Sequence, residues 1–116
     1  MTDKSASRPG DAVVLPLAEP RGQKLFGLGT IYATPAVLLH LSTHARLPLE
    51  LLALHKAGEW DGLDEHDRKA NEEALKTGGR ILSMFEVEGE KIFVITEAES
   101  ESGVRPSTCL LLAREY

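Results

Sequence analysis

Five side chains between positions 55 and 83 are the residues of this chain best suited to form a binding site. An imidazole transfers protons, a guanidinium binds anions, and amides and hydroxyls orient ligands. The five are His55, Trp60, Asn71, Arg80 and Ser83. One interpretation is a shared cleft that holds an anion or a polar ligand. The other is structural: Asn71 pins a loop through the free carbonyls that end the second helix, and Trp60 fills the core.

Two further groups have residue types that bind metal ions. His40 and His44 stand four positions apart, which brings two imidazoles to one helix face, but the glutamate of a zinc-protease helix is missing. The acidic run at residues 61–67 lacks the alternating oxygen ligands of a calcium loop, and helix capping explains it better. The sequence therefore predicts no metal site and no cofactor.

The usual signatures of catalysis are also missing. Gly78-Gly79 follows an expected helix and so meets the negative end of its dipole, which disfavours phosphate. Cys109 lies in an apolar strand, which is typical of an inert core thiol. Since no serine stands in a nucleophile-elbow motif, we predict no catalytic residue.

Composition narrows the class of protein. A chain of 116 residues has the size of one domain, and its net charge of −5 disfavours binding to nucleic acid. The single cysteine rules out an intrachain disulfide and fits a reducing compartment. No apolar run suits a signal peptide or a membrane span. We expect a cytoplasmic protein without membrane contact.

The N-terminal part divides into an arm and the start of a domain. Residues 1–24 carry three prolines and two glycines, which predicts a flexible arm. Its one apolar patch, Val13-Val14-Leu15, can dock on the body of the domain or add to a sheet edge. Residues 25–33 predict a first strand. Thr34-Pro35 then predicts a helix start, because the Thr hydroxyl caps a free N–H and Pro suits the first position. The folded domain is expected to cover residues 25–116.

Two more helices and three strands follow. Pro48 starts a second helix that Gly58 ends, and Asp64 caps a third that runs to Thr77. Residues 81–87 and 91–98 read as a hairpin, and residues 107–113 as a last strand. The prediction is an α+β domain with one strand, three helices and a three-stranded antiparallel meander. Both faces of the meander carry apolar groups, so one face needs the arm or a partner to cover it.

From Gly29 to Tyr116 the chain resembles a family of small uncharacterised proteins of plasmids and integrative conjugative elements in proteobacteria. The shared pattern comprises Thr34-Pro35, Leu38, Pro48, Leu51-Leu52, His55, Gly58, Trp60, Leu63, Asp67, Asn71, Ala74-Leu75, Gly79-Arg80, Ser83, Ile95-Thr96-Glu97-Ala98 and Glu115-Tyr116. Relatives differ at Glu59 and are shorter at residues 99–106. The resemblance implies a mobile-element setting and no established activity.

These observations lead to two functional hypotheses. The first is a non-enzymatic accessory protein of a mobile element that binds another protein, from the host or from the element. The alternative is a small enzyme, either a RelE-like ribonuclease toxin or a hydrolase, with His55 as acid or base and Arg80 as anion binder. A homodimer is a further option if the arm leaves the second sheet face open.

Overall fold

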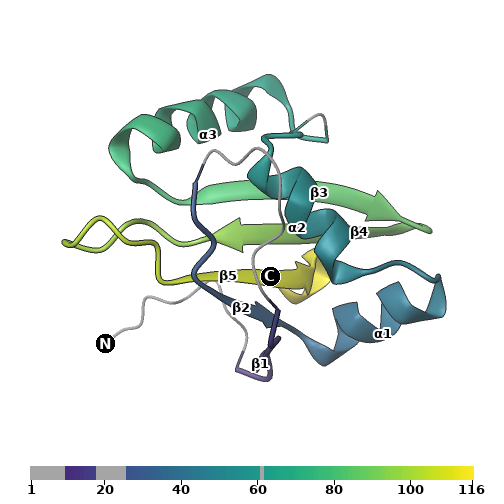
Figure 1. Cartoon of the computed structure of the whole chain (residues 1–116). Coiled ribbons are helices and arrows are strands. Elements are labelled where there is room, and N and C mark those ends of the chain that lie inside the picture. The colour runs from purple at the N-terminus through teal and green to yellow at the C-terminus, as the bar shows by residue number, and fades with distance from the viewer. Residues whose placement is uncertain (1–9, 18–25, 61) are drawn as a thin grey trace.

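The computed structural model describes residues 10–17, 26–60 and 62–116, which form a mixed five-stranded sheet and three helices (Figure 1). The helices are α1 (Pro35–Thr43), α2 (Pro48–Lys56) and α3 (Glu65–Thr77). The strands are β1 (Val13–Val14), β2 (Thr30–Ala33), β3 (Ile81–Val87), β4 (Glu90–Thr96) and β5 (Ser107–Leu112), with a 3-10 helix at Ala113–Glu115. The predicted α+β class is confirmed.

The number and order of the strands differ from the prediction. The spatial order is β1-β2-β5-β4-β3, in which β2 runs parallel to β5 and the other pairs are antiparallel. The meander β3-β4-β5 is present, but it is joined to β2, because the chain returns through three helices and a hairpin to lie beside it. Val13–Val14 adds a fifth strand. Residues 1–9 and 18–24 of the expected arm lie outside the described residues.

The helix ends follow the capping signals in the sequence. The Thr34 hydroxyl accepts a hydrogen bond from the Val37 N–H at 3.1 Å, and the Asp64 carboxylate accepts one from the Asp67 N–H at 2.8 Å. Gly58 and Gly78 have φ values of 80° and 82°, in the left-handed region that glycine adopts without a Cβ clash. The starts of α1 and α3 and the ends of α2 and α3 are thus fixed locally.

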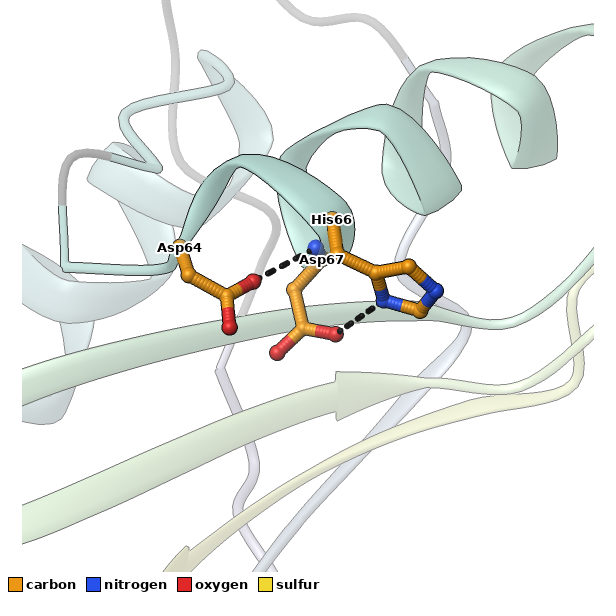
Figure 2. A group of neighbouring side chains, drawn as sticks. All are labelled: Asp64, His66 and Asp67. Atoms are coloured by element: carbon orange, nitrogen blue, oxygen red, sulfur yellow. Dashed lines mark hydrogen bonds and ion pairs between the residues drawn. The ribbon is translucent and has the colours of Figure 1, made fainter.

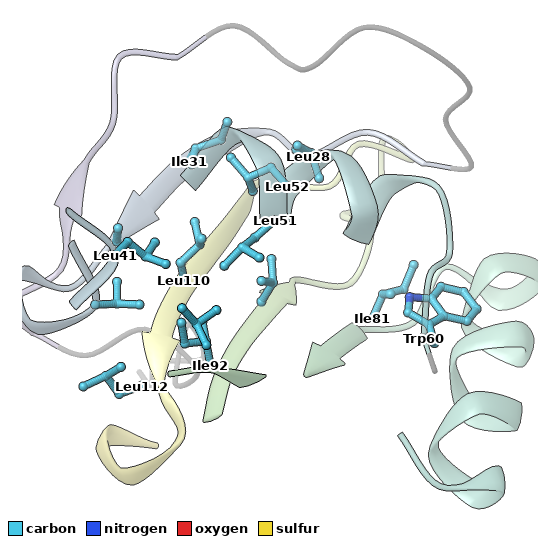
Figure 3. Packing of buried hydrophobic residues seen from close by; sticks show 14 of the residues in the cluster. Leu28, Ile31, Leu41, Leu51, Leu52, Trp60, Ile81, Ile92, Leu110 and Leu112 are labelled. Atoms are coloured by element: carbon cyan, nitrogen blue, oxygen red, sulfur yellow. The ribbon is translucent and has the colours of Figure 1, made fainter. Parts of the chain in front are cut away.

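Helices α1 and α2 cover one face of the sheet, which we call the inner face, and α3 lies along the β3 edge (Figure 1). Val37 and Leu41 of α1, with Leu51 and Leu52 of α2, pack with apolar residues from every strand except β1 (Figure 3). Ala74 of α3 belongs to the same cluster. Central β5 is buried along nearly its whole length, which explains why its sequence is leucine-rich rather than alternating.

The opposite, outer face of the sheet carries a second apolar cluster. Ile95, Cys109 and Leu111 are at most 2% exposed, and Ala12, Tyr32, Leu82 and Phe93 pack around them. Among the described residues, no helix side chain belongs to this cluster. The C-terminus folds over part of the face, because the Tyr116 ring meets the Phe93 ring edge to face at a centroid distance of 5.5 Å. The sheet is therefore apolar on both sides, as predicted.

Candidate functional site

His55 lies at the centre of a buried chain of polar side chains on the inner face. Its Nδ1 atom is 2.5 Å from the Ser83 Oγ atom, and its Nε2 atom is 2.8 Å from the Thr96 Oγ1 atom. The Thr96 hydroxyl lies 2.7 Å from that of Thr108, which donates to the Leu28 carbonyl at 2.8 Å. The chain thus links α2 to β3, β4, β5 and the segment before β2.

The Leu28 carbonyl fixes the direction of every bond in this chain. Because Thr108 gives its only hydroxyl proton to that carbonyl, Thr96 must donate to Thr108. His55 must then donate to Thr96 through Nε2–H. Because burial also holds the pKa of His55 well below its usual value, Nδ1 carries no proton and accepts that of Ser83. His55 is therefore the neutral Nε2–H tautomer, and each hydroxyl has a donor role.

The surroundings of His55 keep it uncharged. Burial lowers the pKa of His55 from its usual 6.5 to about 3, and the positive charge of Arg105 acts in the same direction. The Phe26 ring lies edge to face with the imidazole at a centroid distance of 5.1 Å. A group with this pKa does not change charge near neutral pH.

The pairing of Ser83 and His55 resembles the nucleophile and base of a hydrolase, but its burial prevents that use. In such enzymes a base accepts the serine proton and a third group, usually a carboxylate, orients the base. Here a hydroxyl, that of Thr96, occupies the third position. His55, Ser83 and Thr96 are each 0% exposed, so no substrate reaches the Ser83 oxygen. This arrangement acts as a pin between α2 and the sheet.

Asn71 makes a different kind of contact, at the free edge of β3. Its amide NH₂ donates to the Leu82 carbonyl at 2.6 Å, and its amide oxygen accepts from the Leu82 N–H at 3.0 Å. The backbone N–H and C=O groups of Leu82 point away from β4. In an antiparallel pair these groups alternate in direction, so those of the neighbours Ile81 and Ser83 point toward β4. Asn71 therefore acts like one residue of an additional strand. The partners predicted from the sequence, the carbonyls that end α2, were wrong.

Arg80 and Trp60 lie apart from the buried chain. Arg80 is exposed, and its guanidinium donates to the Tyr116 hydroxyl and lies 5.9 Å from the centre of the Tyr116 ring, on the outer face. Trp60 is 7% exposed within the inner core, as the structural interpretation proposed, and its Nε1–H has no acceptor among the described residues (Figure 3). Among the hydrogen bonds of the described residues, His55–Ser83 is the one that joins two of the five predicted site residues.

The sheet separates the two residues that the enzymatic hypothesis requires. His55 bonds to Ser83 and Thr96 on the inner face, whereas Arg80 contacts Tyr116 beside Phe93 on the outer face. His55, Asn71, Arg80 and Ser83 consequently do not line one cleft. The first three occupy three different surroundings: a buried hydroxyl chain, a covered strand edge and an exposed face.

Sequence reasoning missed three residues that complete these surroundings. Thr96 and Thr108 face each other across β4 and β5, and two opposed threonines inside apolar strands are a signal for an internal polar group. Arg105, only 5% exposed, donates to the carbonyls of Gly79, Glu97 and Ala74 at 2.5, 3.0 and 3.2 Å. It thereby caps the end of α3.

The two groups considered for metal binding have other roles. The His40 Nε2–H donates to the Val87 carbonyl at 2.7 Å, which leaves one free nitrogen beside exposed His44. Asp64, His66 and Asp67 lie together at the start of α3 (Figure 2). Each offers one possible metal-ligand atom, and these three atoms lie within 4.8 Å of one another. Asp64 uses its carboxylate as the α3 cap, and all three lie at the surface or near it. Exposed acidic groups at a helix start are explained by the helix dipole alone.

Two of the hollows on the described surface have a defined lining close to the elements discussed above. One, of about 320 Å³, lies beside Arg105 and is lined by Phe26, Gly27, Gly29, Leu75, Glu99, Gly103 and Val104 as well. The larger, of about 770 Å³, lies between the end of α1 and the start of α2. We call it the α1–α2 groove, and it is lined by Leu38, Leu39, Leu41, Ser42, Ala45, Arg46, Leu47 and Pro48.

Comparison with known proteins finds no matching family model, no similar curated protein and no similar solved structure. Within the described part of the chain, every helix is too short or too polar to cross a bilayer.

Proposed function

We propose that this chain is a non-enzymatic protein-binding module that holds an apolar segment of another protein in the α1–α2 groove. The observation that carries the proposal is the exposure of two leucines at this groove. Leu39 is 68% exposed and Leu47 is 61% exposed, on either side of the turn that joins the helices. Large apolar side chains that gather around a hollow mark a site for a partner more often than scattered ones do.

The lining of the groove suits an amphipathic helix as the occupant. Such a helix lays apolar side chains spaced one turn apart into a hydrophobic groove. Most of the groove lining is aliphatic, and Arg46 and Ser42 supply polar groups at its rim. An apolar stripe with polar flanks on the partner satisfies both parts of this surface.

The backbone at the groove provides separate support. Ala45 has a φ of 56°, in the left-handed region, where a Cβ costs roughly 1–2 kcal/mol relative to glycine. The corresponding residue after α2 is Gly58, with a φ of 80°. The methyl group of Ala45 adds apolar lining to the groove at the expense of stability, as strained residues at functional sites do.

The enzymatic alternative lacks comparable support. It requires His55 and Arg80 to act on one substrate, but His55 is 0% exposed and Arg80 contacts Tyr116 on the other side of the sheet. The resemblance to proteins of mobile elements agrees with an accessory protein whose partner comes from the host or from the element. Induced expression tests the toxin version: growth arrest that His55→Ala or Arg80→Ala relieves would favour the enzyme.

Site-specific photo-crosslinking tests the binding proposal. A photoreactive phenylalanine derivative replaces Leu47 in the full-length chain, and the matched control carries it at Leu54, which is 40% exposed and lies outside the groove. We expect one defined adduct with a second protein from position 47, and none from position 54. Equal adducts from both positions, or none from either, would contradict the proposal.

A further inference from the structure

We infer that the hollow beside Arg105 is a binding site for a free amino acid with an apolar side chain. We call this hollow the Arg105 hollow. It lies where the end of α3, the loop between β4 and β5 and the segment before β2 meet, at one end of the sheet (Figure 1). It shares no lining residue with the α1–α2 groove, so the inference is independent of the proposed function.

Arg105 provides the group that binds the carboxylate of the ligand. The residue is 5% exposed, and its two terminal nitrogens donate to the carbonyls of Gly79, Glu97 and Ala74. Its Nε–H has no acceptor among the described residues. The Nε atom is also absent from the enclosed side-chain atoms that lack a partner, so it touches solvent, and Arg105 lines this hollow. A buried guanidinium with a free N–H binds a carboxylate through a charge-assisted hydrogen bond.

Arg105 and Glu99 are the two charged residues of the lining, and a gap separates them. Neither forms an ion pair among the described residues. The two charges nevertheless interact: burial lowers the pKa of Arg105, and the Glu99 carboxylate raises it. A cation and an anion held apart in one hollow suit a ligand that carries the opposite pair of charges. A free amino acid carries both, a carboxylate and an ammonium, at neutral pH.

The end of α3 favours an ammonium beside Glu99. The Glu99 N–H donates to the Gly78 carbonyl at 2.8 Å. The Glu99 carboxylate lies against Gly78, because a Cβ on that glycine would come within 2.7 Å of the Glu99 Oε1 atom. The C-terminal end of a helix carries partial negative charge, which repels a carboxylate and attracts a cation. An ammonium at this point therefore interacts favourably with both the helix end and Glu99.

The apolar part of the lining selects the side chain of the ligand. Phe26 is buried, Leu75 is half-buried and Val104 is 60% exposed. The Arg105 guanidinium lies 5.8 Å from the centre of the Phe26 ring, so the anion-binding group adjoins the apolar wall. The volume of about 320 Å³ is at the small end of the range for ligand sites. A molecule of the size of leucine suits such a space.

NMR titration of the isotope-labelled, full-length chain with L-leucine, up to about 20 mM, tests the inference. We expect saturable shifts of the Arg105 Nε–H signal and of the amides of Phe26 and Gly103. The Kd should be on the order of 1 mM, because the ligand has few atoms. Isocaproate lacks the ammonium and L-leucinamide lacks the carboxylate, so each should bind at least tenfold more weakly. Leucinamide also represents the N-terminus of a peptide, which the site should reject.

A charge-removing variant of Glu99 provides the second part of the test. Glu99→Gln keeps the size of the side chain, and it should weaken L-leucine at least tenfold without weakening isocaproate. Glu101→Gln is the matched control, because Glu101 is exposed in the same loop but does not line the hollow. It should bind L-leucine like the wild type. Arg105 is left intact because it also caps α3, so lost binding is not confused with lost stability.

Each of four results would overturn the inference. The first is the absence of saturable shifts with L-leucine, and the second is a set of shifts that lies away from the hollow. The third is an analogue that binds as tightly as L-leucine, which would leave a site for a single charge. The fourth is unchanged affinity in Glu99→Gln, with circular dichroism showing that the variant is folded.

Discussion

The His55 Nδ1 atom accepts the hydroxyl proton of Ser83 across 2.5 Å, and neither residue reaches solvent. The geometry is that of a general base beside a serine, yet the pair serves to hold α2 on the sheet. Because every donor and acceptor in the chain from Ser83 to the Leu28 carbonyl has a partner, the loss of one group leaves another buried and unsatisfied. This property allows a structural role to be tested.

Ser83→Ala should destabilise the protein by about 1–3 kcal/mol, because the His55 Nδ1 atom loses its only donor inside the core. Urea denaturation measures the change in the free energy of unfolding. Ser42→Ala is the matched control: Ser42 is exposed and makes one long bond of 3.4 Å, so its loss should change stability by less than about 0.5 kcal/mol. Equal stabilities for the two variants would refute the role given to this chain.

Acid should unfold the protein through His55. In the folded state the pKa of His55 is about 3, below its usual 6.5, so between these values only the unfolded state binds the proton. This contribution to stability is fully present above about pH 6.5 and falls by about 1.4 kcal/mol for each pH unit below it, until pH nears 3. Denaturation at pH 7.5, 6 and 5 measures the slope. A curve without this loss in that window would contradict the burial of a neutral imidazole.

Asn71→Ala should destabilise the fold and uncover an edge strand. The substitution removes both bonds to the Leu82 backbone, and we expect a loss of about 1–3 kcal/mol and a greater tendency to aggregate. Asn71→Asp is the informative comparison, since its carboxylate still accepts from the Leu82 N–H but repels the Leu82 carbonyl. Thermal melting and light scattering report the two effects. An unchanged melting temperature in Asn71→Ala would instead favour a functional role for this amide.

Ala45→Gly should stabilise the protein by roughly 1 kcal/mol, because glycine adopts the φ of 56° without the Cβ clash. Gly89→Ala, at a φ of 84° in the β3–β4 turn, provides the opposite case and should be destabilising. Thermal denaturation measures the change in stability of both variants. If Ala45→Gly gains stability but binds the crosslinked partner less tightly, the strained Ala45 contributes to binding in the α1–α2 groove.

Local features of the fold could be predicted from the sequence, and long-range ones could not. Thr34, Asp64 and Gly78 act through neighbours within four residues, so helix starts and stops were predictable. Nothing near Ala45 in the sequence indicates a left-handed residue, because alanine is not selected for it. The parallel pairing of β2 with β5 joins residues about 77 positions apart, such as Thr30 and Ser107, and no local pattern encodes it.

The same distinction applies to the candidate site. The residue types at positions 55, 71 and 83 correctly indicated unusual polar groups in apolar surroundings. Their partners depend on the register of the sheet: Ser83 pairs with Val94 and lies diagonally from Thr96 on the inner face, and Leu82, next to Ser83, turns its backbone groups to the free edge. A shift of one residue would reverse these orientations. Sequence reasoning therefore found the groups but not the contacts that decide their role.

The affinity of the crosslinked partner for groove variants tests the central proposal most directly. Titration calorimetry with the purified partner should give a Kd for Leu39→Ala about 10- to 100-fold weaker than for the wild type, since burying a leucine side chain contributes roughly 1.5–3 kcal/mol. Leu54→Ala, an exposed leucine outside the groove, should bind like the wild type. Equal affinities for Leu39→Ala and the wild type would contradict a binding site between α1 and α2.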